Sequence, residues 1–286
     1  MNDWLLFDPM FRVPFFTGLA LAVALSLIGA LLRLRAEWLA ALGLSQVAAA
    51  GAMLAVWLSG PALLGASLAA VGAMALRSML QRVGNSHHAL MILIGWSATL
   101  IIGAHMDHGQ VVSETFLRGQ LYFTRHEHLI GAVGLLVVAL GLYPWLTPRL
   151  LVTRFFPDYH AANGIPVWPH RLSYALLVIG ATVLGTISVG AFPAFALLFV
   201  PPWIGFVLVD GWTRSVLAAV GIGVTAYVAS FVLAMVLDQP FGPVLTALLV
   251  GLAALRFVST VRRRGGEAQP DGPITETRSA PPSPAS

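Results

Sequence analysis

The sequence predicts an all-α polytopic membrane protein: a bundle of eight or nine transmembrane helices, with the N-terminus outside and the C-terminus in the cytoplasm. Three observations support this prediction. Of the 286 residues, 58% are hydrophobic and only 10% are charged, whereas a soluble domain has roughly 25% charged residues. Uncharged apolar runs recur at about 20 residues, the length that crosses a bilayer as a helix. Finally, the arginines alternate between successive connections, as the positive-inside rule requires.

The apolar runs define the predicted spans, which lie near residues 13–32, 38–58, 61–80, 87–105, 128–147, 172–191, 193–209, 214–237 and 241–258. The seventh run is short and contains Pro201-Pro202, so we expect a broken or re-entrant helix there. Small residues crowd several runs, for example VAAAGAMLA at 47–55. Such stretches let helix backbones approach closely, and we expect most of them to serve packing within the bundle.

Charge sets the predicted orientation and the domain boundaries. Every second connection contains arginines, from Arg33 and Arg35 to Arg262–Arg264, and these connections should face the cytoplasm. We therefore expect an external N-terminal segment (1–12), a transmembrane domain (13–258) and a cytoplasmic tail (259–286). The tail is rich in Gly, Pro, Ser and Glu, so it should be disordered.

Composition excludes several classes of function. The chain has no cysteine, which removes disulfides and thiolate metal sites. It has no lysine, and a Walker A motif needs lysine beside the phosphates. No Asp, Glu or His is expected near the middle of a span, which argues against proton-driven transport. The arginines lie in loops, which is typical of topology rather than nucleic-acid binding. We expect a protein that is not an enzyme and draws energy from another subunit.

A polar stretch, residues 148–171, interrupts the apolar sequence on the arginine-rich side. Irregular backbone of this kind must lie outside the bilayer unless protein or water satisfies its amides. Asp158 follows Pro157 and can cap a short helix that ends near Gly164. We interpret the stretch as a surface that meets a partner; the alternative is a solvated loop with incidental turn residues.

Four segments carry a resemblance to a known family. They are, in chain order, FLRGQLYFT at 116–124, PDYHAANG at 157–164, Val189-Gly190-Ala191 followed by Pro201, and DQPFGP at 238–243. Their order and spacing resemble those of the permease subunit of zinc/manganese ABC importers. The resemblance extends over residues 13–258.

The resemblance implies a permease in the bacterial inner membrane that transports Zn(II) or Mn(II) and holds no permanent cofactor. It also implies a cytoplasmic ATP-binding cassette ATPase, an external metal-binding protein and a second permease chain, which we expect to be identical. Segment 148–171 would then be the ATPase coupling segment. Its expected contact residues are Phe156, Pro157, Asp158, His160, Asn163 and Gly164.

One departure from the family pattern bears on the cargo. The family commonly has an Asp and a His one turn apart in the second span, where this chain has Leu42 and Gln46. A carboxylate and an imidazole suit a divalent ion, whereas Leu and an amide do not. Gln46 is still expected to line the pathway. The alternatives are a permease for a metal chelate, or a membrane scaffold that does not transport.

Histidines in the predicted outer loop are the remaining candidate ligands. His105, Asp107 and His108 combine donor types that borderline metals accept. They predict an external loading site for metal. The alternative is that these side chains contact lipid headgroups or the binding protein.

Overall fold

The computed structural model describes residues 9–79, 85–119 and 121–267, and all regular secondary structure in these ranges is helical. The elements are α1 (Pro9–Arg35), α2 (Trp38–Trp57), α3 (Ala62–Met79), α4 (Asn85–Ala104), α5 (Gly109–Arg118), η2 (Leu121–Phe123), α6 (His126–Phe155), α7 (Tyr159–Ala162), α8 (Trp168–Ser188), α9 (Ala191–Leu208), α10 (Trp212–Val236) and α11 (Phe241–Glu267).

Eight of these helices, α1–α4, α6 and α8–α10, are long and apolar enough to cross a membrane. The ninth predicted span falls on α11, whose apolar part is the shorter stretch Phe241–Ala254. The predicted polytopic all-α fold is therefore confirmed. α11 continues to Glu267, past the predicted end of the transmembrane domain at residue 258, since arginine is a good helix former and the helix can run on into water. Residues 1–8 and 268–286 of the predicted terminal segments lie outside the described residues.

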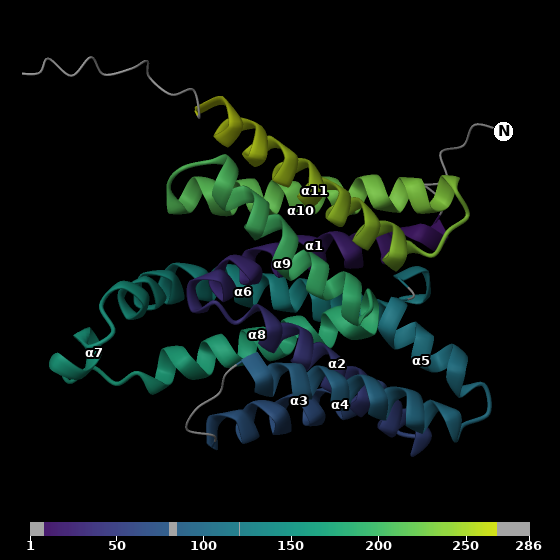
Figure 1. Cartoon of the computed structure of the whole chain (residues 1–286). Helices are drawn as coiled ribbons and strands as arrows, with labels where there is room; N and C mark the ends of the chain where they lie inside the picture. The colour runs from purple at the N-terminus through teal and green to yellow at the C-terminus, as the bar shows by residue number, and fades with distance from the viewer. Residues whose placement is uncertain (1–8, 80–84, 120, 268–286) are drawn as a thin grey trace, which may run out of the picture.

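α1 forms the centre of the bundle, where it packs against α6, α8, α9 and α10 (Figure 1). Its side chains Leu21, Leu25 and Ile28 are fully buried. α2 packs against α3 and α4 on one side of this centre, and α11 covers α9 and α10 on the other. The short helix α7 projects from one end of the bundle, beyond the ends of α6 and α8 (Figure 1).

Glycines bring α2, α3 and α4 into backbone contact. A methyl group on Gly51 would collide with the Gly65 carbonyl of α3, and one on Gly65 would collide with the Gly51 carbonyl. On the other side of α2, a methyl group on Gly95 of α4 would collide with the backbone of Gln46. The close approach that the small residues at 47–55 predict is therefore confirmed.

The predicted break at Pro201-Pro202 is wrong, because α9 is one helix that contains both prolines. Pro202 has no N–H to donate to the Leu198 carbonyl four residues earlier. Gly29 of α1 packs directly on this carbonyl oxygen, so closely that a methyl group on Gly29 would overlap it. The neighbouring helix thus covers the backbone group that the proline leaves free, which is how membrane helices tolerate proline.

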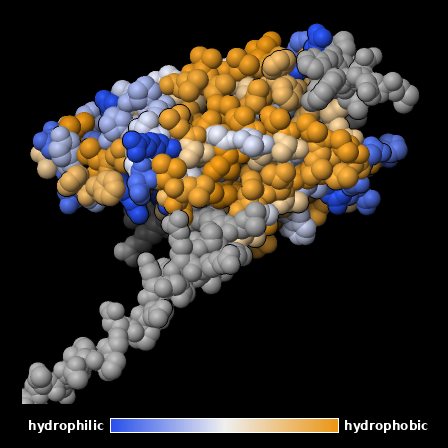
Figure 2. Space-filling view, turned by 90° about the horizontal axis from the view of Figure 1, so that it is seen from above, coloured by the Kyte–Doolittle hydropathy of each residue, from blue (hydrophilic) through white to orange (hydrophobic). Residues whose placement is uncertain are grey.

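On the face that Figure 2 shows, exposed apolar side chains form a broad belt, and polar side chains gather towards the two ends. Elsewhere on the bundle, α3, α4 and α6 also carry exposed apolar side chains, including Leu68, Leu93 and Val137. Such a surface is stable only against lipid or another apolar protein face. Figure 2 therefore supports a membrane position for the middle of the bundle.

Candidate functional site

The predicted coupling segment contains the short helix that the sequence indicates. α6 runs on to Phe155, and α7 then spans Tyr159–Ala162. The helix closes as predicted: Gly164 has a φ of +62°, and the Ile165 N–H donates to the His160 carbonyl at 2.9 Å. The side chain of Asn163 donates to the Tyr159 carbonyl at 2.8 Å. Glycine is the residue that accepts this left-handed closing position without strain.

The coupling segment presents aromatic side chains outside the apolar belt. Phe155, Phe156 and Tyr159 are exposed, and Pro157 and Asp158 are exposed between them. Aromatic residues in a polar setting are typical of protein contact surfaces. The exposed residues of this segment therefore have the composition expected of a docking surface.

His160 differs from the other predicted coupling residues because its ring is buried. It lies against His170 of α8, with 5.1 Å between the ring centroids. This contact holds α7 to the start of α8, so the His160 ring faces the interior of the chain rather than a docking partner. Nδ1 of His160 and Nε2 of His170 are buried without a hydrogen-bond partner among the described residues.

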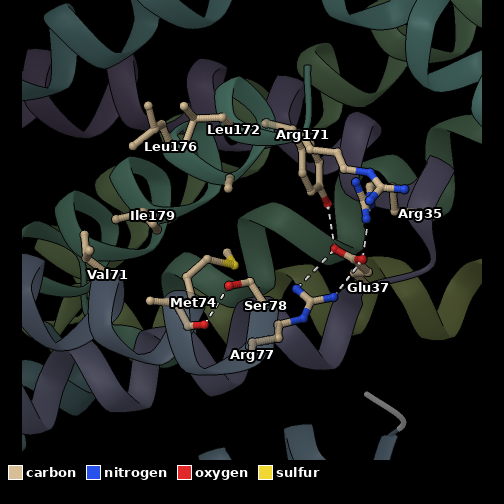
Figure 3. A pocket seen from close by; sticks show the side chains of 13 residues that line it. Arg35, Glu37, Val71, Met74, Arg77, Ser78, Arg171, Leu172, Leu176 and Ile179 are labelled. Carbon is tan, nitrogen blue, oxygen red and sulfur yellow. Dashed lines mark hydrogen bonds and ion pairs between the residues drawn. The ribbon is translucent and has the colours of Figure 1, made fainter. Parts of the chain in front are cut away.

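A buried carboxylate organises the arginine-rich end of the bundle (Figure 3). Glu37, in the α1–α2 connection, accepts from Arg35 Nε at 3.1 Å and Arg77 Nη2 at 2.7 Å. The Tyr174 hydroxyl donates to it at 3.3 Å, and the Arg35 guanidinium also stacks on the Tyr174 ring. We call Arg35, Glu37, Arg77 and Tyr174 the Glu37 cluster. Burial raises the pKa of Glu37, but the charges and hydrogen bonds of the two arginines outweigh burial, so its pKa is lowered overall.

The Glu37 cluster joins three helices that the sequence leaves separate. Arg77 lies near the end of α3, and its side chain is largely buried against Glu37. The cluster and its surroundings also bring together arginines at the helix ends beside three connections, namely α1–α2, α3–α4 and α6–α8. These three arginine-bearing connections therefore lie at one end of the bundle, as the charge alternation predicts.

Two cavities adjoin the Glu37 cluster. The larger, about 660 Å³, lies between α3 and α8 and includes Arg35, Glu37, Arg77 and Arg171 in its lining (Figure 3). The smaller, about 290 Å³, shares Arg35, Glu37 and Arg171 and extends to Arg154 and Pro157. The second cavity connects the cluster to the beginning of the coupling segment.

Inside the bundle, Gln46 is fully buried in α2, and Leu42 lies one turn before it, partly buried. Neither the amide oxygen nor the amide nitrogen of Gln46 has a hydrogen-bond partner among the described residues. The neighbouring Ser45 hydroxyl and the Ser188 hydroxyl of α8 are also buried without hydrogen-bond partners among the described residues. A buried amide without hydrogen-bond partners destabilises the bundle, and it can still form hydrogen bonds with a polar ligand that reaches it.

The outer candidate residues do not form a ligand group in the structure. His105, Asp107 and His108 are exposed on the turn between α4 and α5, and the His105 ring already bonds the Ile101 carbonyl at 2.8 Å. Over the described ranges, no three His, Cys, Asp or Glu side chains are arranged to hold a metal ion. The loading role of this turn stays a prediction.

Comparison with known proteins identifies the family. The profile of the ABC 3 transport family matches residues 7–260, nearly the whole helical part of the chain. The chain belongs to the ABC 3 transport family. It is therefore a multi-pass membrane permease of an ABC transporter, the system in which a separate subunit hydrolyses ATP. No curated protein sequence is significantly similar to this chain.

Two solved structures share the fold of this family member. One is the PsaBC complex of Streptococcus pneumoniae bound to a Fab, at 17% identity and a TM-score of 0.77, covering 89% of this chain and 93% of that one. The other is an inward-facing protein assigned as a metal-chelate type ABC transporter, at 14% identity and a TM-score of 0.70, covering 86% and 85%.

The structure gives a physical reason for three glycines of the segments that resemble the zinc/manganese permeases. Gly119 (φ +87°) packs on the Val189 carbonyl, and Gly190 (φ +102°) packs on the Gly119 amide. Gly242, at the start of α11, packs on the Arg118 carbonyl. Segments about 70 and about 120 residues apart in the chain thus meet backbone to backbone at the end opposite the Glu37 cluster, and no side chain fits between them.

Proposed function

We propose that this chain is the permease subunit of an ABC importer for a divalent metal ion, zinc or manganese. The observation that carries the proposal is the exposed helix α7, closed at Gly164, within a chain of the ABC 3 transport family. The metal cargo is supported by the four segments that resemble zinc/manganese permeases, and by the shared fold with a metal-chelate type transporter.

In this proposal the chain makes and breaks no covalent bond. A separate ATPase docks on Phe156–Gly164, and ATP binding and hydrolysis move this segment. Because α7 is held to α8 through His160 and His170, movement of α7 passes directly into a transmembrane helix. The helices would then rock between outward- and inward-facing arrangements. An external binding protein delivers the metal, and a second permease chain completes the pathway.

A metal chelate is the second candidate cargo, and Gln46 favours it. An unpaired buried amide can donate to and accept from a polar organic ligand, whereas Leu42 and Gln46 together offer a bare divalent ion neither a carboxylate nor an imidazole. Uptake of metal by proteoliposomes, with and without excess chelator, separates the two cargoes. A bare-ion permease loses uptake when chelator is added, and a chelate permease gains it.

Coupling through α7 is tested by replacing glycine with alanine at two matched positions. Gly164→Ala forces a side chain into a left-handed conformation, which costs about 1–2 kcal/mol at the end of α7. Gly211→Ala introduces at least as much strain in the α9–α10 connection, because a φ of +90° with a ψ of +137° is a conformation that few residues other than glycine adopt, and the added methyl group also meets open space. We expect Gly164→Ala to lower transport-stimulated ATPase activity by about fivefold or more, and Gly211→Ala to leave it near wild type. Equal effects of the two variants would contradict a coupling role for α7.

A further inference from the structure

The larger cavity at the Glu37 cluster has two chemically different halves (Figure 3). One half carries Arg35, Arg77 and Arg171 around a single acid, Glu37. The other half is a wall of apolar side chains from α3 and α8. The wall includes Val71, Met74, Leu172, Leu176 and Ile179. A ligand that fits both halves must be an anion with a hydrocarbon part.

The charged half retains positive charge after its internal ion pairs are made. Glu37 balances one of the three arginines, so the lining has a net charge of about +2 by residue count. Arg35 and Arg77 are engaged by Glu37, whereas the side chain of the exposed Arg171 makes no hydrogen bond or ion pair with the described residues. A guanidinium presents five N–H donors in a planar fork, which matches the oxygens of a phosphate group.

The apolar half is open to the exterior of the bundle. Val71, Leu172 and Leu176 are exposed, and the two leucines follow each other by one turn along α8. Arg171 directly precedes this pair, at the position where the apolar run of α8 begins. The arginines therefore lie at the level of lipid headgroups, and the leucines lie at the level of acyl chains. A soluble anion would have no contact with this wall.

We propose that this cavity binds an anionic phospholipid. Its phosphate would lie against Arg171 and the outer faces of Arg35 and Arg77, and an acyl chain would follow Val71, Leu172 and Leu176. Basic pockets between transmembrane helices on the cytoplasmic side have the chemistry that binds anionic headgroups. The lipid would lie near α7, because the smaller cavity extends from Arg171 to Pro157, two residues before that helix. The proposal does not depend on which cargo the permease transports.

The test is lipid binding to the purified full chain, measured by native mass spectrometry in detergent. Phosphatidylglycerol should bind saturably and more tightly than phosphatidylcholine of the same acyl composition. Arg171→Gln should weaken phosphatidylglycerol binding about fivefold, the contribution of one basic residue near the membrane surface. Arg214→Gln removes the same charge from another exposed position, in the first turn of α10 and outside the cavity, and it should leave the affinity unchanged. Equal affinity for the two lipids, or equal effects of the two variants, would overturn the proposal.

Further experiments distinguish a bound phospholipid from other ligands of the cavity. Leu176→Ala should weaken phosphatidylglycerol binding, and glycerophosphoglycerol, which lacks acyl chains, should compete poorly. If inorganic phosphate or the headgroup alone competes as well as the lipid, the site is a simple anion site and the proposal is wrong.

Because the chain has no cysteine, a single Val71→Cys variant reports contact with a second copy. Efficient oxidative cross-linking of two chains through this position would show that a partner chain occupies the face, and would also overturn the lipid assignment.

Discussion

Removing the charge of Glu37 should destabilise the bundle far more than the same change in an exposed ion pair. In Glu37→Gln, Arg35 and Arg77 lose their common counter-ion, although the side chain keeps its shape. The carboxylate accepts from four donors, at 2.7 Å and 3.4 Å from Arg77, 3.1 Å from Arg35 and 3.3 Å from Tyr174. The side chains of Glu37 and Arg77 are only 14% and 17% exposed, and that of Arg35 is 32% exposed.

The size of the effect follows from this partial burial. Breaking a fully buried ion pair by removing one partner costs about 3–5 kcal/mol, and a surface pair contributes about 0–1 kcal/mol. Between these limits we expect Glu37→Gln to lower the free energy of unfolding by about 2 kcal/mol. By the usual scaling for a chain of this size, the melting temperature should fall by about 4–8 °C. Thermal unfolding in detergent, followed by the fluorescence of the eight tryptophans, measures the shift.

The matched control is Glu114→Gln, which breaks the Glu114–Arg118 pair on α5. Both side chains are mostly exposed there, at 58% and 63%, and their charged atoms are 3.4 Å apart. We expect a loss below about 0.5 kcal/mol, because solvent screens this pair. Equal melting temperatures for wild type and Glu37→Gln, or equal shifts for the two variants, would refute the role assigned to the Glu37 cluster.

Four further predictions follow from the same structure. Because its pKa is lowered in the folded chain, the Glu37 carboxylate stabilises the fold at pH values above its unfolded pKa of about 4.3, and this stabilisation is lost as the pH falls through the folded pKa. The melting temperature should therefore drop more steeply in acid for wild type than for Glu37→Gln. Parallel plots of melting temperature against pH for the two proteins would contradict this. Gln46→Met should leave the melting temperature unchanged or raise it, because the amide that it removes has no hydrogen-bond partner among the described residues. The same variant should lower metal uptake. Normal uptake would show that Gln46 does not line the pathway. If the outer turn loads metal, the double variant His105→Ala, His108→Ala should take up less metal while its expression stays normal. Unchanged uptake would show that these side chains only contact lipid headgroups or the binding protein. Gly119→Ala should lower the free energy of unfolding by about 2 kcal/mol or more, because the added methyl group overlaps backbone atoms and φ is +87°. In Gly134→Ala the methyl group meets open space in α6, so this variant should be neutral or mildly stabilising. Similar melting temperatures for the two variants would contradict the backbone contact at Gly119.

The fold was largely predictable because its strongest signals are local in sequence. Apolar length fixes a transmembrane helix, and charge alternation places Arg35, Arg77 and Arg171 at one end without knowledge of the packing. The end of α7 was predictable for a similar reason, because Gly164 is a helix stop that acts within its own segment.

What the sequence did not reveal depends on neighbours in space. Glu37 is two residues from Arg35 and looks like half of a local loop ion pair, and nothing in the sequence indicates that Arg77 and Tyr174 reach the same carboxylate. A lone acid in an arginine-rich connection was the available signal. The break expected at Pro201-Pro202 failed because Gly29 of another helix covers the free carbonyl. Likewise, spacing alone could not show that His160 turns inward to His170.

Transport in proteoliposomes tests whether this chain is a metal permease that a separate ATPase drives through α7. The vesicles would contain the full chain with its ATPase subunit and its external binding protein, and zinc and manganese would be offered both free and chelated. We expect the metal to accumulate inside only when ATP is supplied to the ATPase, and we expect Gly164→Ala to reduce this accumulation while Gly211→Ala does not. If the ATPase binds the chain but neither metal accumulates in either form, the chain is a scaffold and the claim is contradicted.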